Sequence, residues 1–154
     1  MGLLVVELLA QKFIGHVKKV CMENPIKCLL IEDDPDDQEV FKIAVAALRD
    51  FEIEVTTAGS GVQAFEILNR ESLPDCIFLD LNMPLMNGRE FLKKLKRIER
   101  LKEIPVIIYS TSSDARDKTD MMFLGASQFI TKPNSIEELN RILLRELGRV
   151  NAMR

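Results

Sequence analysis

Acidic, hydroxyl and lysine side chains follow four apolar runs of this 154-residue chain. They are Glu32 with Asp33, then Asp80, Ser110 and Lys132. Two carboxylates about 4 Å apart repel by about 4 kcal/mol at an effective dielectric of about 20, so clustered acids protonate, separate or bind a cation. Oxygen ligands suit magnesium, and a lysine supplies a positive charge for phosphate. Together these residues predict phosphoryl transfer to a carboxylate nucleophile, with Asp80 as the acceptor.

Each of these residue types also has a purely structural use. Acids that follow a strand commonly cap the next helix, and we assign that role to Asp34, Asp36 and Asp37. Serine and threonine after a strand commonly form turns, and a lysine before a proline, such as Lys132, is commonly solvated. The chemical interpretation therefore depends on whether the fold brings the ends of the four runs together.

The sequence patterns predict five strands that alternate with five helices. Apolar runs predict strands at 26–31, 76–79, 106–109 and 128–130, and period-two alternation predicts an edge strand at 51–55. Helices are expected after Asp34, around 64–68, around 91–98, over 113–124, and from the capping box of Ser135 and Glu138 to a stop at Gly148.

This order of elements indicates the fold class. Mostly apolar strands that alternate with helices form a parallel sheet covered on both faces. With right-handed crossovers, we expect an α/β fold with a doubly wound five-stranded parallel sheet. Functional sites of such sheets lie beyond the carboxyl ends of the strands, which is where all the candidate side chains would meet.

Composition narrows the classes of function. Hydrophobic residues make up 47% of the chain and charged residues 29%, as in a globular domain with a substantial core. The net charge of −3 argues against a nucleic-acid binder with a basic surface, and no apolar stretch reaches the roughly 20 residues of a membrane span. Cys21, Cys28 and Cys76 lack metal-binding spacing, and we interpret them as reduced cysteines of a cytoplasmic protein.

Residues 1–21 precede the alternating pattern and form a separate N-terminal extension. Apolar residues recur at helical spacing from Val6 to Val20, which favours an extra amphipathic helix or sequence translated ahead of a start at Met22. A helix for dimerisation or for a partner protein is the alternative. The lysines follow the apolar run, unlike those of a secretory signal. The single histidine of the chain, His16, also lies in this extension. Because a single histidine without a partner seldom serves in phosphotransfer or metal binding, we do not assign it to either role.

Four motifs in order give the chain a resemblance to the receiver domains of two-component response regulators, in particular to single-domain, chemotaxis-regulator-like ones. Leu29-Leu30-Ile31-Glu32-Asp33-Asp34 resembles the acidic motif of the first strand, and Leu79-Asp80-Leu81-Asn82-Met83-Pro84 with Gly88 resembles the phosphorylation motif. Pro105 to Ser110 resembles the strand that ends in the switch hydroxyl. Phe129-Ile130-Thr131-Lys132-Pro133 resembles the strand before the family's lysine, and the resemblance covers about residues 26–147.

The resemblance implies a flavodoxin-like (βα)5 receiver fold and a phosphoacceptor site. Asp80 would accept a phosphoryl group from a phosphohistidine of a sensor histidine kinase or a histidine phosphotransfer protein. Asp33, Asp80 and the backbone carbonyl of Asn82 would bind magnesium directly, and Glu32 would act through water. Glu32 stands where aspartate is more common in the family, but it is still acidic.

The remaining site residues are implied to couple phosphorylation to a change of shape. Lys132 would pair with the phosphoryl group, Ser110 would move to hydrogen-bond it, and Phe129, in place of a frequent tyrosine, would turn inward. The surface around the fourth helix, fifth strand and fifth helix would change as a result. We therefore expect a phosphoacceptor signalling domain rather than an enzyme, with at most slow self-catalysed phosphorylation and dephosphorylation.

Three other kinds of protein use parts of the same pattern. An aspartyl phosphatase of the haloacid dehalogenase type needs a second aspartate two residues after the nucleophile, where this chain has Asn82. A flavodoxin-like nucleotide or flavin binder needs a phosphate loop rich in glycine or hydroxyls after the first strand, where this chain has Glu32-Asp33-Asp34. A receiver fold that no longer takes phosphate is the third, and the complete set of site residues argues against it.

The predicted organisation is an N-terminal extension at 1–21, a receiver domain at 22–150 and a C-terminal tail at 151–154. Because few residues follow the last expected helix, we expect no DNA-binding module after it. We therefore expect output through protein contacts, with a downstream partner, a phosphorelay histidine protein or a second copy in a homodimer, and without nucleic acid or membrane.

Overall fold

The computed structural model describes residues 24–70 and 72–154, so the predictions for the extension at 1–21 lie outside the described residues. Within these ranges strands and helices alternate. The strands are β1 (Ile26–Ile31), β2 (Ile53–Ala58), β3 (Cys76–Leu79), β4 (Val106–Ser110) and β5 (Gln128–Thr131). The helices are α2 (Pro35–Ala46), α3 (Gly61–Leu68), α4 (Gly88–Arg97), α5 (Ala115–Phe123) and α6 (Ile136–Ala152).

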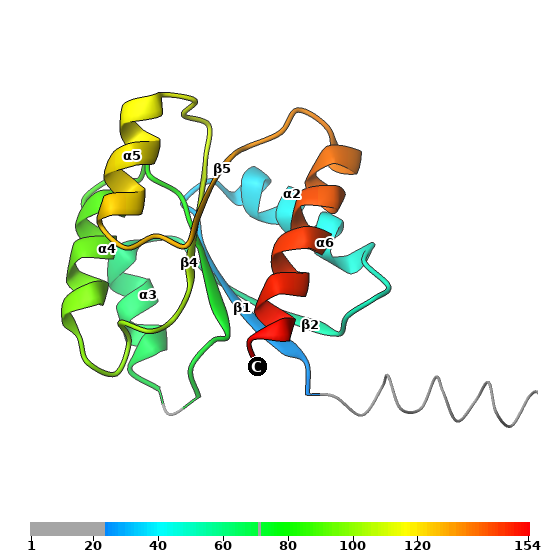
Figure 1. Ribbon diagram of the computed structural model, residues 1–154, viewed down its shortest axis with the longest axis horizontal. Coiled ribbons are helices and arrows are strands. Elements are labelled where there is room, and N and C mark those ends of the chain that lie inside the picture. Colours follow the sequence, from blue (N-terminus) through cyan, green and yellow to red (C-terminus); the bar gives the residue numbers. More distant parts are fainter. Residues whose placement is uncertain (1–23, 71) are drawn as a thin grey trace, which may run out of the picture.

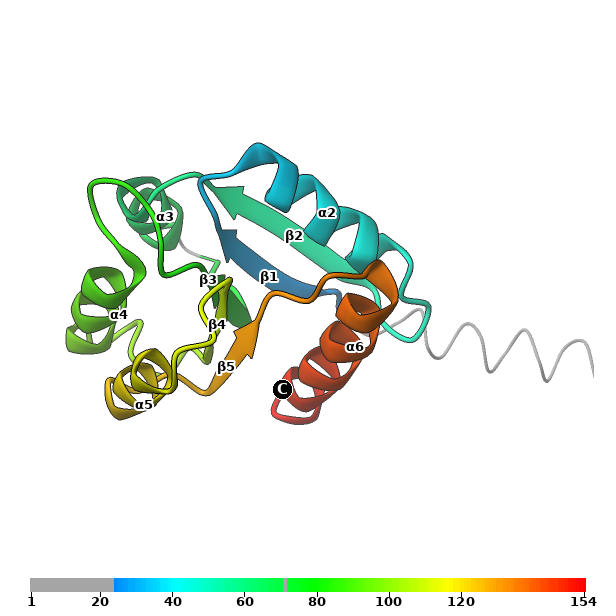
Figure 2. The same cartoon turned by 90° about the horizontal axis from the view of Figure 1, so that it is seen from above.

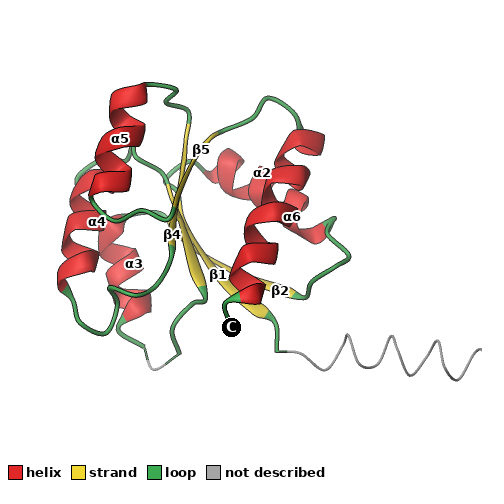
Figure 3. Ribbon diagram, in the orientation of Figure 1, coloured by secondary structure: helices red, strands yellow, loops and turns green. Residues whose placement is uncertain are grey.

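The five strands form one parallel sheet in the order β2-β1-β3-β4-β5. The chain runs from β1 to the edge strand β2, then returns past β1 to β3, β4 and β5, so the winding direction reverses once. Helices α2 and α6 consequently cover one face, and α3, α4 and α5 cover the other (Figures 1 and 2). Figure 3 shows the resulting three layers of helix, sheet and helix. The predicted doubly wound five-stranded parallel sheet is confirmed.

Each face of the sheet has its own hydrophobic core because successive strand residues point to opposite faces. On one face, Leu30 of β1 packs in a cluster with Phe41 of α2 and Leu143 of α6. On the other, Leu29 and its neighbours pack with the buried residues of α3, α4 and α5. Burial on both faces explains why β1, β3 and β4 are almost entirely apolar.

The edge strand lies further along the chain than the sequence predicts. Its expected range was 51–55, whereas β2 spans Ile53–Ala58. Thr56 and Thr57 extend the pairing with β1, because their branched side chains suit a half-covered strand. The predicted alternation holds, since exposed and partly buried residues alternate along most of β2.

The prediction that the last helix stops at Gly148 is wrong, because α6 continues to Ala152. A glycine inside a helix costs about 1 kcal/mol. Burial of Val150, which is 3% exposed and packs with the α2–α6 core, favours continuation of the helix beyond Gly148 and offsets that cost. The first residues of the predicted tail therefore continue the helix.

The end of α6 returns to the start of β1. The Arg154 guanidinium donates a hydrogen bond to the Asn24 carbonyl at 2.7 Å, and its Nε lies 3.8 Å from Oδ1 of Asp75. These contacts lie at the amino ends of β1 and β3. Among the residues that the structure describes, none of the helices combines the length and apolarity needed to cross a bilayer.

Candidate functional site

The predicted acids meet at the carboxyl edge of the sheet. The Asp80 N–H donates to the Ile31 carbonyl at 3.0 Å, which extends the pairing of β3 with β1 by one residue and fixes the Asp80 backbone. One carboxylate oxygen from each of Glu32, Asp33 and Asp80 lies within 4.8 Å of the other two. The structure therefore brings together the three acids that the sequence predicts, while their chemical roles stay predictions.

Lys132 joins this cluster from the segment after β5. Its Nζ lies 2.5 Å from Oε2 of Glu32, 2.8 Å from Oδ2 of Asp37 and 3.8 Å from Oδ2 of Asp80. Its side chain is only 10% exposed, so the alternative of a solvated lysine is wrong. The fold thus places one ammonium group between a buried glutamate and the candidate nucleophile.

Asp37 is a site residue that the sequence analysis missed. Asp34 caps α2 as predicted, because its Oδ1 accepts a hydrogen bond from the Asp36 N–H at 2.8 Å. Asp37 lies in the same first turn, but its carboxylate also binds Lys132, 95 residues further along the chain. Acids in a first turn look alike in sequence, and only the rotation of α2 relative to β5 distinguishes Asp37 from its neighbours.

Burial makes the negative charges of the site costly. It raises the pKa of Glu32 to about 7, even though Lys132 and the Asp34 N–H stabilise the carboxylate. It also raises the pKa of Asp80. Burial disfavours the charged form of Lys132 too, but hydrogen bonds with Asp37 and Glu32 outweigh it and raise the pKa of the ammonium group. Lys132 therefore stays charged, and a second cation would relieve the remaining repulsion among the carboxylates.

The loop after Asp80 is held close to it. The Asn82 N–H lies 3.3 Å from Oδ1 of Asp80, and the Gly88 N–H donates to the Leu81 carbonyl at 3.0 Å. A Cβ at Gly88 would overlap the Asp80 carbonyl oxygen and lie 2.8 Å from the Leu81 Cα, so only glycine fits. Leu85 sits in a γ-turn with φ 67°, closed by the Met86 N–H and the Pro84 carbonyl. The position of the Asn82 carbonyl as a metal ligand stays a prediction.

The two predicted switch residues lie on the neighbouring strands β4 and β5. Ser110 is fully buried, and its Oγ accepts a hydrogen bond from the Ser112 N–H at 3.2 Å. Ser112 is fixed in turn by Asp117 of α5 at 2.6 Å. Phe129 is partly buried and packs against the core of the α3–α5 face. Their movements on phosphorylation stay predictions.

Tyr109 is a second residue near the site that the sequence analysis missed, because the sequence pattern placed it only in a strand. It is 4% exposed, directly precedes Ser110, and its ring lies beside Lys132. Its proximity to the site depends on the packing of α2 and β5 against β4, which no local sequence pattern reveals.

Comparison with known proteins gives one consistent result. A family model for the response regulator receiver domain matches residues 28–144. The two-component response regulator ORR5 of Oryza sativa subsp. japonica is 36% identical over 113 residues, which are 73% of this chain and 84% of that protein. The solved structure of the phosphorylated cyanobacterial phytochrome response regulator RcpA is similar, with 33% identity, a TM-score of 0.71, and coverage of 78% of this chain and 89% of that chain. The Mn(2+)-bound form of the response regulator Rcp1 has 27% identity, a TM-score of 0.68, and coverage of 77% and 89%.

Proposed function

The chain belongs to the response regulator receiver domain family, and from this premise we propose that it is a stand-alone receiver whose Asp80 accepts a phosphoryl group. The observation that carries the proposal is the position of Asp80, whose carboxylate lies within 4.8 Å of oxygens of Glu32 and Asp33 and 3.8 Å from Lys132. A nucleophile, cation ligands and a fixed ammonium group are the parts that phosphoryl transfer requires.

In the proposed reaction a carboxylate oxygen of Asp80 forms a bond to the phosphorus of a phosphohistidine. The nitrogen–phosphorus bond of the donor breaks, and the donor imidazole leaves with the electron pair. Lys132 would pair with the new phosphoryl oxygens, and its ammonium group would then give up part of its contact with Glu32 and Asp37. The chain has no second acid two residues after Asp80 to drive rapid turnover, which supports a signalling role.

The carboxylate cluster fits magnesium. We propose that Asp33, Asp80 and the Asn82 carbonyl hold the ion, with Glu32 acting through water. When bound, the ion would neutralise the charge between the carboxylates and the phosphoryl group. The raised pKa of both Glu32 and Asp80 supports this proposal, because these buried carboxylates lack enough positive charge. The Mn(2+) in the similar Rcp1 structure supports it too, and the phosphorylated state of RcpA supports the proposed role of Asp80.

The signal would pass from Asp80 to the surface through Ser110 and Phe129. Because Ser110 ends β4 and Phe129 lies within the neighbouring strand β5, their movement would alter the face formed by α5, β5 and α6, where a protein partner or a second copy would bind. We propose a sensor histidine kinase or a histidine phosphotransfer protein as the donor. The buried free thiols of Cys28 and Cys76 suit a cytoplasmic protein.

Intact mass spectrometry after incubation with acetyl phosphate and magnesium tests the proposal. We expect one added phosphoryl group that is stable to acid and labile to base, and none in Asp80→Asn. The matched control is Asp36→Asn, because Asp36 is an exposed acid near the site that lies outside the carboxylate cluster. Equal uptake by Asp80→Asn would overturn the assignment, as would sustained hydrolysis of a generic phosphate ester over many cycles.

A further inference from the structure

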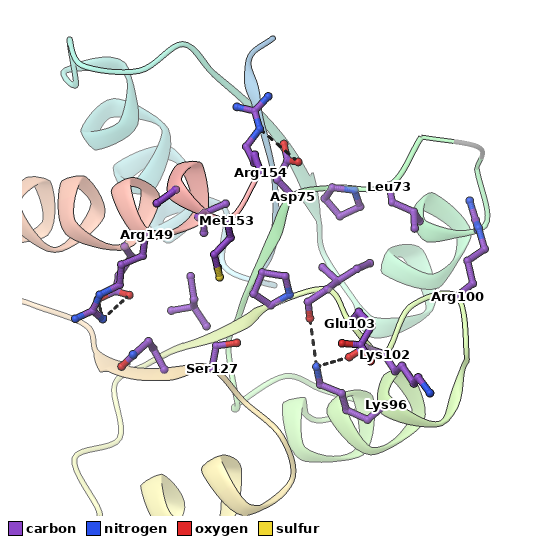
Figure 4. A pocket seen from close by; sticks show the side chains of 18 residues that line it. Leu73, Asp75, Lys96, Arg100, Lys102, Glu103, Ser127, Arg149, Met153 and Arg154 are labelled. Atoms are coloured by element: carbon purple, nitrogen blue, oxygen red, sulfur yellow. Dashed lines mark hydrogen bonds and ion pairs between the residues drawn. The ribbon is translucent and has the colours of Figure 1, made fainter. Parts of the chain in front are cut away.

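A groove of about 980 Å³ opens at the amino ends of β3, β4 and β5, opposite the end of the sheet where Asp80 lies. Figure 4 shows the side chains that line it. Its walls come from the last turns of α6, the segment before β3 and the connection from α4 to β4. Buried Ile104, Ile107 and Val150 line it, and Met153 beside them is 68% exposed. Methionine is an adaptable apolar contact residue, so this part of the groove can take up apolar side chains.

Cationic side chains outnumber anionic ones along the groove. The five cations are Lys96, Arg100, Lys102, Arg149 and Arg154, and the three anions are Asp75, Glu103 and Glu146. The whole chain has a net charge of −3. The groove is therefore a positive region on a negatively charged protein, which attracts acidic segments selectively.

Two of these cations are held in place by the fold. Nζ of Lys96 donates to the carbonyls of Lys102 and Ile104 at 2.8 and 3.2 Å, which orients the ammonium group without cancelling its charge. Arg149 binds both carboxylate oxygens of buried Glu146 at 3.3 Å, yet its side chain is 54% exposed. Because these groups are already ordered, a ligand that meets them loses less affinity to side-chain ordering.

We propose that this groove is a docking site for a segment of a partner protein in which apolar side chains are flanked by aspartate or glutamate. The apolar side chains would pack on Met153 and the buried lining, and the acids would meet Lys96 and Arg149. The chain's own first 21 residues carry three lysines and a single acid, and a symmetric contact with a second copy would bring two positive grooves together. Charge complementarity thus favours a separate acidic partner.

Two synthetic peptides with the same leucine spacing, one with glutamate and one with lysine at the flanking positions, test this proposal by titration of the full chain in NMR. The glutamate peptide should shift resonances of Ile107 and Met153 and bind at least about tenfold more tightly than the lysine peptide, which corresponds to about 1.4 kcal/mol. Met153→Glu and Arg149→Gln should each weaken binding by about tenfold, and Arg145 still pairs with Glu146 in the second variant. Lys118→Glu is the matched control, because Lys118 is an exposed lysine of α5 outside the groove.

Equal affinity for both peptides, or binding of the glutamate peptide that Met153→Glu leaves unchanged, would overturn the proposal. Self-association that Met153→Glu abolishes would assign the groove to a second copy instead. Changes in the resonances of residues 1–23 on Met153→Glu, without peptide, would assign it to the chain's own N-terminal segment. Neither outcome depends on phosphorylation of Asp80.

Discussion

The ammonium nitrogen of Lys132 lies 5.3 Å from the centroid of the Tyr109 ring. The same ring makes edge contacts with Phe41 and Phe78, at centroid distances of 5.7 and 6.5 Å. Tyr109 is the single tyrosine of a chain that has no tryptophan. The intrinsic tyrosine signal of the protein therefore reports directly on the surroundings of Lys132, without labelling.

We expect magnesium to change the fluorescence of Tyr109, because a cation among the carboxylates weakens their hold on Lys132. Titration of the emission with magnesium measures the affinity. Asp33→Asn should weaken it by more than about tenfold, since loss of even a supporting contact to a metal ligand costs about that much. Asp36→Asn should leave the affinity unchanged. An unaltered titration in Asp33→Asn would contradict the proposed ligand set.

Tyr109 should ionise at unusually high pH. Burial raises its pKa to about 12, against about 10 for an exposed tyrosine. The folded state therefore retains the proton longer than the unfolded state. The raised pKa of Tyr109 therefore contributes about 3 kcal/mol to the free energy of unfolding. This contribution is fully present below about pH 10 and is lost as the pH rises towards about 12.

Absorbance of the tyrosinate ion, recorded together with circular dichroism, tests this prediction. Lys132 lowers the pKa of Tyr109, so Lys132→Met should raise the midpoint further. A midpoint near pH 10 in protein that is still folded would contradict the prediction.

Lys132→Met should destabilise the domain in a pH-dependent way. Removal of one partner from a buried ion pair costs about 3–5 kcal/mol, and protonation of Glu32 limits that cost. The pKa of Glu32 is about 7 with Lys132 present and should rise without it, so the neutral form becomes more populated at low pH. We expect a larger loss in the free energy of unfolding above pH 7 than below it, as measured by urea denaturation with a chelator present.

The double variant Glu32→Gln with Lys132→Met is the matched comparison. Because glutamine carries no charge that needs a partner, it should recover part of the stability that Lys132→Met loses above pH 7. Equal losses on both sides of pH 7, together with no recovery in the double variant, would show that Lys132 and Glu32 are not energetically coupled.

Replacement of glycine by alanine should have opposite effects on stability at Gly88 and Gly148. At Gly88 the new Cβ would overlap the Asp80 carbonyl oxygen, so Gly88→Ala should cost about 1–3 kcal/mol or more and slow the uptake of phosphoryl groups. At Gly148 the Cβ would lie 3.8 Å from Phe51, an ordinary contact inside a helix. Gly148→Ala should therefore stabilise the protein by about 0.5–1 kcal/mol, which thermal denaturation measures. If Gly88→Ala left the stability unchanged or raised it, that result would contradict the close approach of Gly88 to the Asp80 backbone.

The sequence was sufficient to predict the sheet and the three acids of the carboxylate cluster. Residues at strand ends are local features, and the parallel topology then determines that Glu32, Asp33 and Asp80 share one edge. The same reasoning failed where packing between elements determines where a helix or strand ends. Val150 extends α6 past a glycine because it is buried against the α2–α6 core, and the threonines of β2 join the sheet because β1 offers partners.

Asp37 and Tyr109 could not be predicted as site residues for a related reason. Both reach Lys132 across the fold, and their contacts depend on the rotation of α2 and on Tyr109 pointing to the sheet face that α2 and α6 cover. An acid in the first turn of a helix is explained by the helix dipole, and a tyrosine in a strand is explained by strand propensity. Residues with a complete local role are therefore the ones most easily overlooked in a functional site.

The bond between Arg154 and the Asn24 carbonyl places both ends of the described domain at the same point. That point lies at the amino ends of the strands, and Asp80 lies beyond the carboxyl end of β3. A fluorescent protein, an affinity tag or a sensor surface coupled through either end would stand clear of the incoming phosphodonor. The domain could also be inserted as a module into an exposed loop of a host protein, with its chemistry still facing outward.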